Sequence, residues 1–124
     1  MILGVGIDII EVSRVAEKVG RENGFRENVF SSKEIAYCES QTDKAQHYAA
    51  RFACKEAFLK ATGMGLLLGT TLKDIEVVSD HQGKPGVTLY ATFKEEAQKN
   101  SWNKIHVSLT HVQAMACAVV IIEQ

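Results

Sequence analysis

The strongest constraint on the fold of this chain is one long segment of helix-forming residues that no helix breaker interrupts. From about Lys44 to Thr62 the sequence contains neither Gly nor Pro and few β-branched residues, and Gly63 follows at once. We therefore predict a central helix over residues 44–62, with Asp43 as its N-cap. Alanines at every fourth position form a smooth stripe that another element can approach closely. The stripe consists of Ala49, Ala53, Ala57 and Ala61.

The other apolar segments predict strands. Dense Ile, Val and Gly over residues 2–10 predict a buried strand, and the apolar run 114–122 predicts a strand buried on both faces. Alternation over 74–78 predicts a half-exposed strand, which a Gly- and Pro-containing turn joins to 87–90 as a hairpin. Residues 105–110 alternate in the same way and predict a further strand.

Helical periodicity predicts shorter helices between these strands. A helix from Val12 carries apolar residues at i, i+3, i+4 and i+7 on one face, and Gly20 marks its end. A second helix is expected after Ser31, which has capping-box spacing with Glu34. A polar helix is expected at 92–99. A mostly antiparallel sheet with helices on one side, an α+β fold, is the simplest arrangement that buries these faces.

Length and composition are those of one globular domain, so a single domain is expected over residues 1–124. The net charge of -1 excludes the uniformly basic field of a protein that grips nucleic acid. The longest apolar run is far shorter than the roughly 20 residues of a membrane helix. Because the N-terminus also lacks a signal-peptide pattern, we expect a cytoplasmic protein. The cysteines show no paired spacing and predict neither a disulfide framework nor a zinc site.

Two carboxylates far apart in sequence are the first candidates for chemistry. Asp8 lies among branched apolar residues of the first strand, where a buried, unpaired acid costs several kcal/mol. Glu56 lies on the central helix, four residues before Lys60. Each also has a structural interpretation: Asp8 as an acid paired with a backbone amide or an arginine, and Glu56 with Lys60 as a solvated pair worth only ~0.3 kcal/mol.

The charge on the central helix favours a functional interpretation. Arg51, Lys55, Glu56 and Lys60 stand among Ala, Phe, Leu and Cys, and a helix that only fills a core should not carry so much charge. Two carboxylates, together with substrate phosphates and water, are the usual ligands of Mg²⁺. We therefore predict a magnesium and phosphate site in which Lys60 neutralises phosphate charge.

Three further patterns are ambiguous. Gly63 and Gly65 are typical helix C-caps but can also line a pocket. Ser108 and His111 would form a nucleophilic dyad only if a third group orients the imidazole, and the alternative is a turn histidine with satisfied nitrogens. A basic face on the first helix is either solvated or receives an acidic protein partner. That face consists of Arg14, Lys18 and Arg21.

In combination, these motifs resemble the holo-acyl-carrier-protein synthases, which are short bacterial 4'-phosphopantetheinyl transferases. The resemblance spans nearly the whole chain, in order and at the family's spacing. It rests on Gly6-Ile7-Asp8-Ile9, Arg14, Phe30 with Glu34, the segment from Arg51 to Ala61, and Ser108-Leu109-Thr110-His111. The resemblance implies transfer of 4'-phosphopantetheine from coenzyme A to a serine of apo acyl carrier protein, with release of adenosine 3',5'-bisphosphate, for fatty acid biosynthesis.

The resemblance also implies roles for individual residues. Asp8 and Glu56 match the magnesium ligands, and Glu56 and Lys60 are the catalytic candidates. Glu56 or a metal-bound water would take the serine proton. The positions that match the coenzyme pocket are Arg51, Lys60, Gly63, Gly65, Gly83, Lys84, Pro85, Ser108 and His111. The positions implied for carrier binding are Arg14, Lys18 and Arg21.

Similar short members form homotrimers with each site between two subunits, which suits a chain too small to enclose a large coenzyme alone. The sequence departs from the family pattern at Cys54, and at Val112 and Met115, which follow the His111 motif. Two other interpretations remain at this stage. A non-catalytic carrier- or coenzyme-binding module would not need both acids and the lysine, and a magnesium-dependent phosphohydrolase would have no use for the basic first helix.

Overall fold

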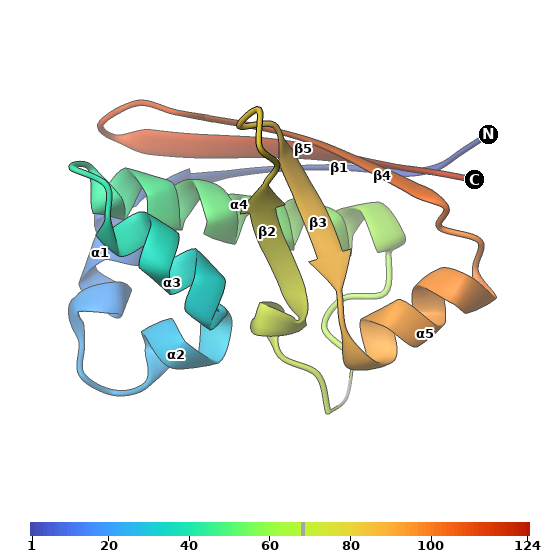
Figure 1. The fold of residues 1–124 in the computed structure, drawn as a ribbon, viewed down its shortest axis with the longest axis horizontal. Coiled ribbons are helices and arrows are strands. Elements are labelled where there is room, and N and C mark those ends of the chain that lie inside the picture. The colour runs from blue at the N-terminus through green and yellow to red at the C-terminus, as the bar shows by residue number, and fades with distance from the viewer. Residues whose placement is uncertain (68) are drawn as a thin grey trace.

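Two antiparallel sheets and one long helix organise the computed structural model, which describes residues 1–67 and 69–124 (Figure 1). The elements in chain order are β1 (Ile2–Glu11), α1 (Val12–Gly20), α2 (Phe25–Val29), α3 (Ser32–Glu39), α4 (Lys44–Thr62), the 3-10 helix η1 (Leu72–Asp74), β2 (Ile75–Ser79), β3 (Pro85–Leu89), α5 (Ala91–Lys99), β4 (Lys104–His111) and β5 (Met115–Glu123). The α+β class is therefore confirmed, although the expected single sheet is divided into two.

The larger sheet has the strand order β1-β5-β4, and the smaller one pairs β2 with β3. Figure 1 shows α4 running along one side of the larger sheet, with the other helices on that same side. The opposite face is uncovered, so Val5, Ile7 and Ile9 are 59%, 62% and 64% exposed. Likewise β5 alternates buried and half-buried residues. The prediction that β1 is buried and β5 is buried on both faces is wrong for a single chain, because none of the residues that the structure describes packs on this outer face.

Two glycines let β1 lie directly on α4. Gly4 and Gly6 are two positions apart and therefore share the face of β1 that meets the helix. A Cβ atom on either would lie 1.9 Å from a backbone oxygen, that of Ala61 for Gly4 and that of Ala57 for Gly6. The close approach predicted for the alanine stripe is thus confirmed, and β1 is the approaching element. It brings Asp8, on the same strand face, against α4.

A buried ion pair joins α3, α4 and β2. The side chains of Lys55 and Glu34 are completely buried, and Lys55 Nζ donates to Glu34 Oε1 at 2.9 Å. The same ammonium donates to the carbonyl of Leu72, while Glu34 accepts from the amide of Val77. The predicted capping box is also present, since the Ser31 amide donates to the Glu34 carboxylate. Lys55 is therefore part of the core rather than of a charged surface.

Element boundaries agree well with the sequence predictions. Helix α4 covers the predicted range, and Gly63 ends it in the left-handed region at φ 71°, although the Asp43 side chain makes no capping hydrogen bond. Strand β2 is more buried than expected, with Ile75, Glu76 and Val77 inside. Helices α2 and η1 were not predicted from the sequence. Among the residues described, no helix has the length and apolar character needed to cross a membrane.

Candidate active site

Asp8, Glu56 and Lys60 come together where β1 crosses α4. Lys60 Nζ donates to Asp8 Oδ1 at 2.8 Å and to the backbone oxygen of Ile7 at 3.1 Å. Glu56 lies one helical turn before Lys60 and shares its face of α4. Burial raises the pKa of Glu56, and the negative charge of Asp8 raises it further. The two acids predicted from sequence are therefore electrostatic neighbours, with a lysine beside them.

The donor set fits a hard divalent cation. Two carboxylates in mutual repulsion gain from a cation between them, and oxygen is the ligand that Mg²⁺ prefers. Across residues 1–67 and 69–124 there is no group of three or more His, Cys, Asp or Glu side chains that could hold a metal. Asp8 and Glu56 would therefore supply only part of a coordination shell, which leaves positions for substrate oxygens.

A cavity of about 460 Å³ adjoins the acids. Its lining includes the charged residues Glu56 and Lys60. Gly63 and Gly65, which lie in the loop that follows α4, also line it. Both glycines have positive φ, 71° and 68°, and a Cβ atom at either would meet no heavy atom of the described residues within 4 Å. They are required for the backbone path of this loop, and they also leave the cavity open.

The basic face of α1 reaches the same region. Arg14 and Arg21 are exposed, whereas Lys18 is half-buried with its Nζ 5.8 Å from the centre of the Phe25 ring. The positive charge of Lys18 lowers the pKa of Glu56 and so opposes the larger effects of burial and Asp8. Sequence reasoning missed the aromatic contact between Phe25 and Phe52, whose ring centres are 6.2 Å apart. A partner bound on α1 would therefore lie next to the acids.

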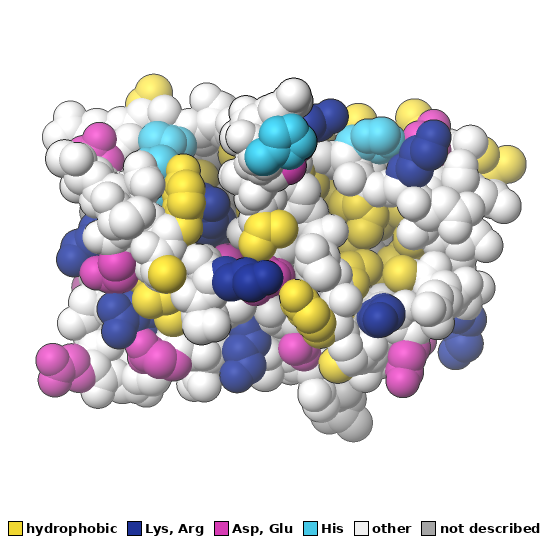
Figure 2. Space-filling view, in the orientation of Figure 1, with side chains coloured by type: hydrophobic (Ala, Val, Ile, Leu, Met, Phe, Trp, Pro, Cys, Tyr) yellow, Lys and Arg dark blue, Asp and Glu magenta, His cyan; other side chains and the backbone are white. Residues whose placement is uncertain are grey.

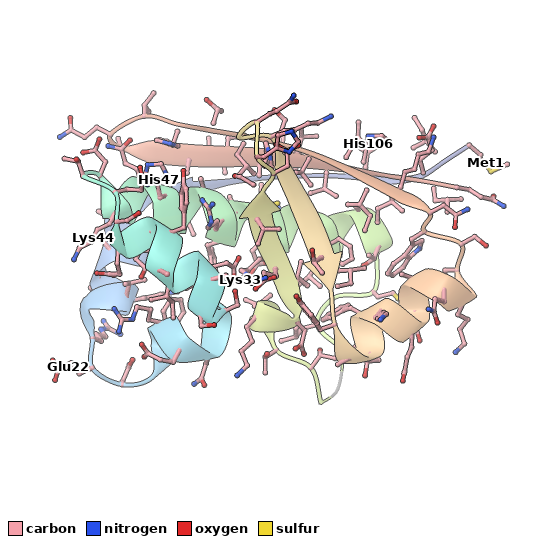
Figure 3. All side chains as sticks on the ribbon, viewed as in Figure 1. Met1, Glu22, Lys33, Lys44, His47 and His106 are labelled. Atoms are coloured by element: carbon pink, nitrogen blue, oxygen red, sulfur yellow. The ribbon has the colours of Figure 1, made fainter. Side chains whose placement is uncertain are left out.

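Arg51 belongs to a second group of site residues. Its side chain is only 4% exposed, and its Nε finds no hydrogen-bond partner in the described part of the chain. The guanidinium stacks on Tyr37, with 4.1 Å from Cζ to the ring centre. It lines a cavity of about 530 Å³ between α3 and the β2–β3 hairpin, together with Lys33 and Tyr90 (Figure 3 labels Lys33). Glu76 also lines this cavity, where it accepts a hydrogen bond from Tyr90, but no described residue forms an ion pair with Arg51. The unpartnered Nε of Arg51 therefore makes this a candidate anion site.

His111 is held beside this second group. Its Nδ1 lies 2.7 Å from Oε1 of Gln46, and its ring centre lies 4.9 Å from that of His47. His47 in turn contacts Tyr37, at 5.5 Å between ring centres. Figure 3 shows His47 at the end of α4 near the β4–β5 turn. Gln46, His47 and Tyr37 were not identified from the sequence, although His47 lies one turn before Arg51 on α4.

Ser108 and His111 do not form a dyad. They are three positions apart on β4 and therefore point to opposite faces of the sheet. Ser108 is exposed on the outer face, where it pairs in register with Val119. The nucleophile interpretation of these residues is therefore wrong. Of the predicted turn, Gly83 and Lys84 are exposed, and the turn is closed by bonds from the amides of Gln82 and Lys84 to Asp80.

Helix α4 separates the two groups. Arg51 and Lys60 are nine positions apart, which is two and a half turns, so they project from opposite sides of the helix. Asp8, Glu56, Lys60, Gly63 and Gly65 form one group, and Arg51 with His111 forms the other. A single chain therefore presents two half-sites rather than one continuous site.

Comparisons with known proteins identify the family. Residues 4–120 match the family model described as the 4'-phosphopantetheinyl transferase superfamily. The chain belongs to this superfamily. The holo-[acyl-carrier-protein] synthase of Syntrophus aciditrophicus is 44% identical over 124 residues, which cover 99% of this chain and 97% of that protein.

Solved structures of other 4'-phosphopantetheinyl transferases share the fold. The holo-[acyl-carrier-protein] synthase from Neisseria meningitidis superimposes with a TM-score of 0.90 over all of both chains at 24% identity, which supports the fold alone. A holo-(acyl-carrier-protein) synthase from Bacillus anthracis, solved in complex with CoA (3',5'-ADP), is 31% identical with a TM-score of 0.79. That match covers 98% of this chain and 96% of the other. The α+β fold with antiparallel sheets is thus that of the family.

Proposed function

We propose that this protein transfers 4'-phosphopantetheine from coenzyme A to a serine of apo acyl carrier protein and releases adenosine 3',5'-bisphosphate. The observation that carries the proposal is the joining of Asp8, Glu56 and Lys60 beside a cavity and next to the basic helix α1. Family membership over residues 4–120 supports the same reaction class. The serine oxygen forms a bond to the phosphorus of the phosphopantetheinyl group while the bond to the departing bisphosphate breaks.

Each residue near the reacting atoms has a separate task. Asp8 and Glu56 would hold Mg²⁺, which when bound supplies positive charge to the pyrophosphate oxygens. Lys60 is placed by Asp8 and Ile7, and its ammonium stabilises the negative charge of the leaving phosphate. Either Glu56, whose pKa is raised by burial and by Asp8, or a metal-bound water would accept the serine proton.

The second half-site would bind the rest of the coenzyme. Arg51 offers a buried guanidinium with an unpaired Nε, and guanidinium suits phosphate because several of its N–H groups can donate at once. His111, which is held by Gln46, and the turn formed by Gly83, Lys84 and Pro85 are assigned to this half-site by the family resemblance. Ser108 would act from the outer face of the sheet, and Gly63 and Gly65 from the first half-site.

A homotrimer would unite the two half-sites. The outer face of the larger sheet presents apolar rows along β1 and β5, and the register places Ile7 opposite Val119 and Val5 opposite Ile121. Exposed contiguous apolar surface of this kind is typical of an interface. If copies pack through this face, we expect the half-site with Lys60 from one copy and the half-site with Arg51 from its neighbour to line one coenzyme site, which α4 prevents within one copy.

We expect the acidic carrier protein to dock on α1. We also expect the protein to be a single cytoplasmic domain, so the docking surface must lie on this domain itself. Lys18 supplies positive charge close enough to act on Glu56, and Arg14 and Arg21 are exposed on the same helix, where Arg21 pairs with Glu17. Figure 2 shows both signs of charge interspersed over the helix-covered face, so this attraction is local. Local complementarity of this kind raises the association rate with an acidic protein.

Mass spectrometry of apo acyl carrier protein, incubated with the protein, coenzyme A and Mg²⁺, tests the reaction. We expect the carrier to gain the mass of phosphopantetheine on one serine and the bisphosphate to appear in equal amount. An unmodified carrier with hydrolysed coenzyme would instead indicate a phosphohydrolase. An unmodified carrier with intact coenzyme would indicate a binding module.

A further inference from the structure

We infer that Gln46 is a positioning residue that keeps the proton of His111 on Nδ1 and so leaves Nε2 free to donate to a coenzyme phosphate once it is protonated. This inference rests on the proposed function, because it assumes that His111 faces the coenzyme. No other step of the proposed reaction requires Gln46.

With Oε1 of Gln46 facing the ring, the contact favours one tautomer of His111. Oε1 of Gln46 lies 2.7 Å from Nδ1 of His111, between the first turn of α4 and the last residue of β4. An amide oxygen only accepts hydrogen bonds, so the ring nitrogen that meets it must carry the hydrogen. Neutral imidazole has one N–H, which leaves Nε2 as its only basic atom. Any proton that His111 gains on binding an anion is therefore added at Nε2.

The surroundings hold the ring in this orientation. His47 packs edge-on against His111, and Tyr37 packs edge-on against the other side of His47. Leu109, two residues earlier on β4, packs into the core on the same strand face. A ring that turned by half a revolution would bring a carbon to Gln46 and lose the hydrogen bond.

The charged groups around His111 come from three segments of the chain. The titratable groups of this region are His47 and Arg51 on α4, Tyr37 on α3 and Asp43 before α4. The charge of His111 and that of Arg51 both lower the pKa of His47, after burial, whereas Asp43 raises it. Arg51 is thus the fixed positive charge of this region, His47 favours its neutral form, and an anionic phosphate is the partner that would favour protonation at Nε2.

Replacing Gln46 separates orientation from charge. Gln46→Met has a similar length and removes the acceptor, so His111 should lose its preference for the Nδ1–H form. Gln46→Glu keeps an acceptor at the same place and adds a negative charge, so the ring should keep its orientation and its pKa should rise. Gln98→Met on α5, at the opposite end of the molecule in Figure 1, is the matched control.

Nitrogen-15 imidazole spectra of the full chain, with the His111 signals assigned by their loss in His111→Gln, measure tautomer and pKa directly. Coenzyme KM is measured in parallel with carrier protein as acceptor. We expect Nδ1–H in the parent protein and in Gln98→Met, and a shifted tautomer in Gln46→Met with a coenzyme KM about two- to tenfold higher. Gln46→Glu should restore that KM and extend activity to higher pH.

The possible failures are distinct. An unchanged His111 tautomer in Gln46→Met, or a KM in Gln46→Glu as high as in Gln46→Met, would overturn the positioning role of Gln46 and leave the proposed function intact. A parent-like coenzyme KM in His111→Gln would overturn His111 as a coenzyme contact, and with it the inference, although transfer to the carrier would still be observed. Loss of transfer from the parent protein itself would overturn the proposed function.

Discussion

Lys60 and Asp8, 52 residues apart in sequence, form an ion pair at 2.8 Å between α4 and β1. Asp8 is largely covered, with 16% of its side chain exposed, whereas Lys60 is 56% exposed. The acid is therefore held in place while the lysine can leave it for another anion. This arrangement suits a site that must neutralise a carboxylate before substrate arrives and a phosphate afterwards.

Loss of either acid should abolish transfer in a magnesium-dependent way. Loss of a group that merely supports a metal ligand costs about 10- to 100-fold in metal affinity or activity, so removing a ligand should cost at least about 100-fold. We expect Asp8→Ala and Glu56→Gln to lose this much activity at low Mg²⁺ and to recover part of it at high Mg²⁺. Glu95→Gln on the exposed face of α5 is the control. Near-parent rates across a magnesium titration would rule out the assignment.

A methyl group at Gly6 should disrupt the site by forcing β1 away from α4. Its Cβ would lie 1.9 Å from the backbone oxygen of Ala57, which can move only with the helix. Gly6→Ala should therefore cost at least about 1–3 kcal/mol in the free energy of unfolding and displace Asp8 from Lys60. Gly20→Ala meets no heavy atom within 4 Å and should be neutral or stabilise α1 by up to about 1 kcal/mol. Urea unfolding and transfer rates measure both effects, and equal stabilities would contradict this packing.

Local patterns predicted much of this fold. Helix α4 was predicted over its observed range because a breaker-free segment with a terminal glycine depends little on tertiary context. The alanine stripe indicated close packing, but the pattern did not identify the partner. That information lies in the spacing of Gly4 and Gly6 on one strand face, which has meaning only once β1 is placed on α4.

Charge patterns were less informative than apolar ones. The charges of α4 were interpreted together as one site, yet only Glu56 and Lys60 lie beside Asp8. Lys55 is bonded to Glu34, a partner 21 residues away whose capping-box role gave no sign of a buried ion pair. Sequence spacing shows which residues share one face of a helix. It does not show which face is buried, because that depends on long-range packing.

Breaking the Lys55–Glu34 pair should destabilise the whole fold. Lys55→Met leaves a buried carboxylate without its cation and the carbonyl of Leu72 without a donor, which should cost about 3–5 kcal/mol. Lys99→Met removes an ammonium that is 75% exposed and should change stability very little. Urea unfolding compares the two variants. A Lys55→Met protein as stable as the parent would show that the pair is dispensable.

Arg51 should behave in the opposite way, since its buried guanidinium forms no ion pair with any described residue. Arg51→Met should therefore leave the free energy of unfolding of the coenzyme-free protein unchanged or increase it. It should raise the coenzyme KM about 10- to 100-fold, because charge-assisted hydrogen bonds to the coenzyme are lost. Arg21→Met provides the crossed control, because it should raise the KM for carrier protein and leave that for coenzyme unchanged. A carrier KM that rises in Arg51→Met instead would place Arg51 in the docking surface.

Mixing two inactive variants should restore activity if the site is shared between copies. Lys60→Ala damages one half-site and Arg51→Ala the other, and α4 keeps these residues on opposite sides within one chain. Each site would take Lys60 from one copy and Arg51 from its neighbour. In randomly mixed trimers each of these residues is native in about half of the copies, so about one quarter of all sites have both. We expect transfer to recover towards that fraction after the variants are unfolded together and refolded. Refolding each variant alone controls for the procedure. Full inactivity of the mixture, with light scattering confirming a trimer, would mean that each chain builds its site alone.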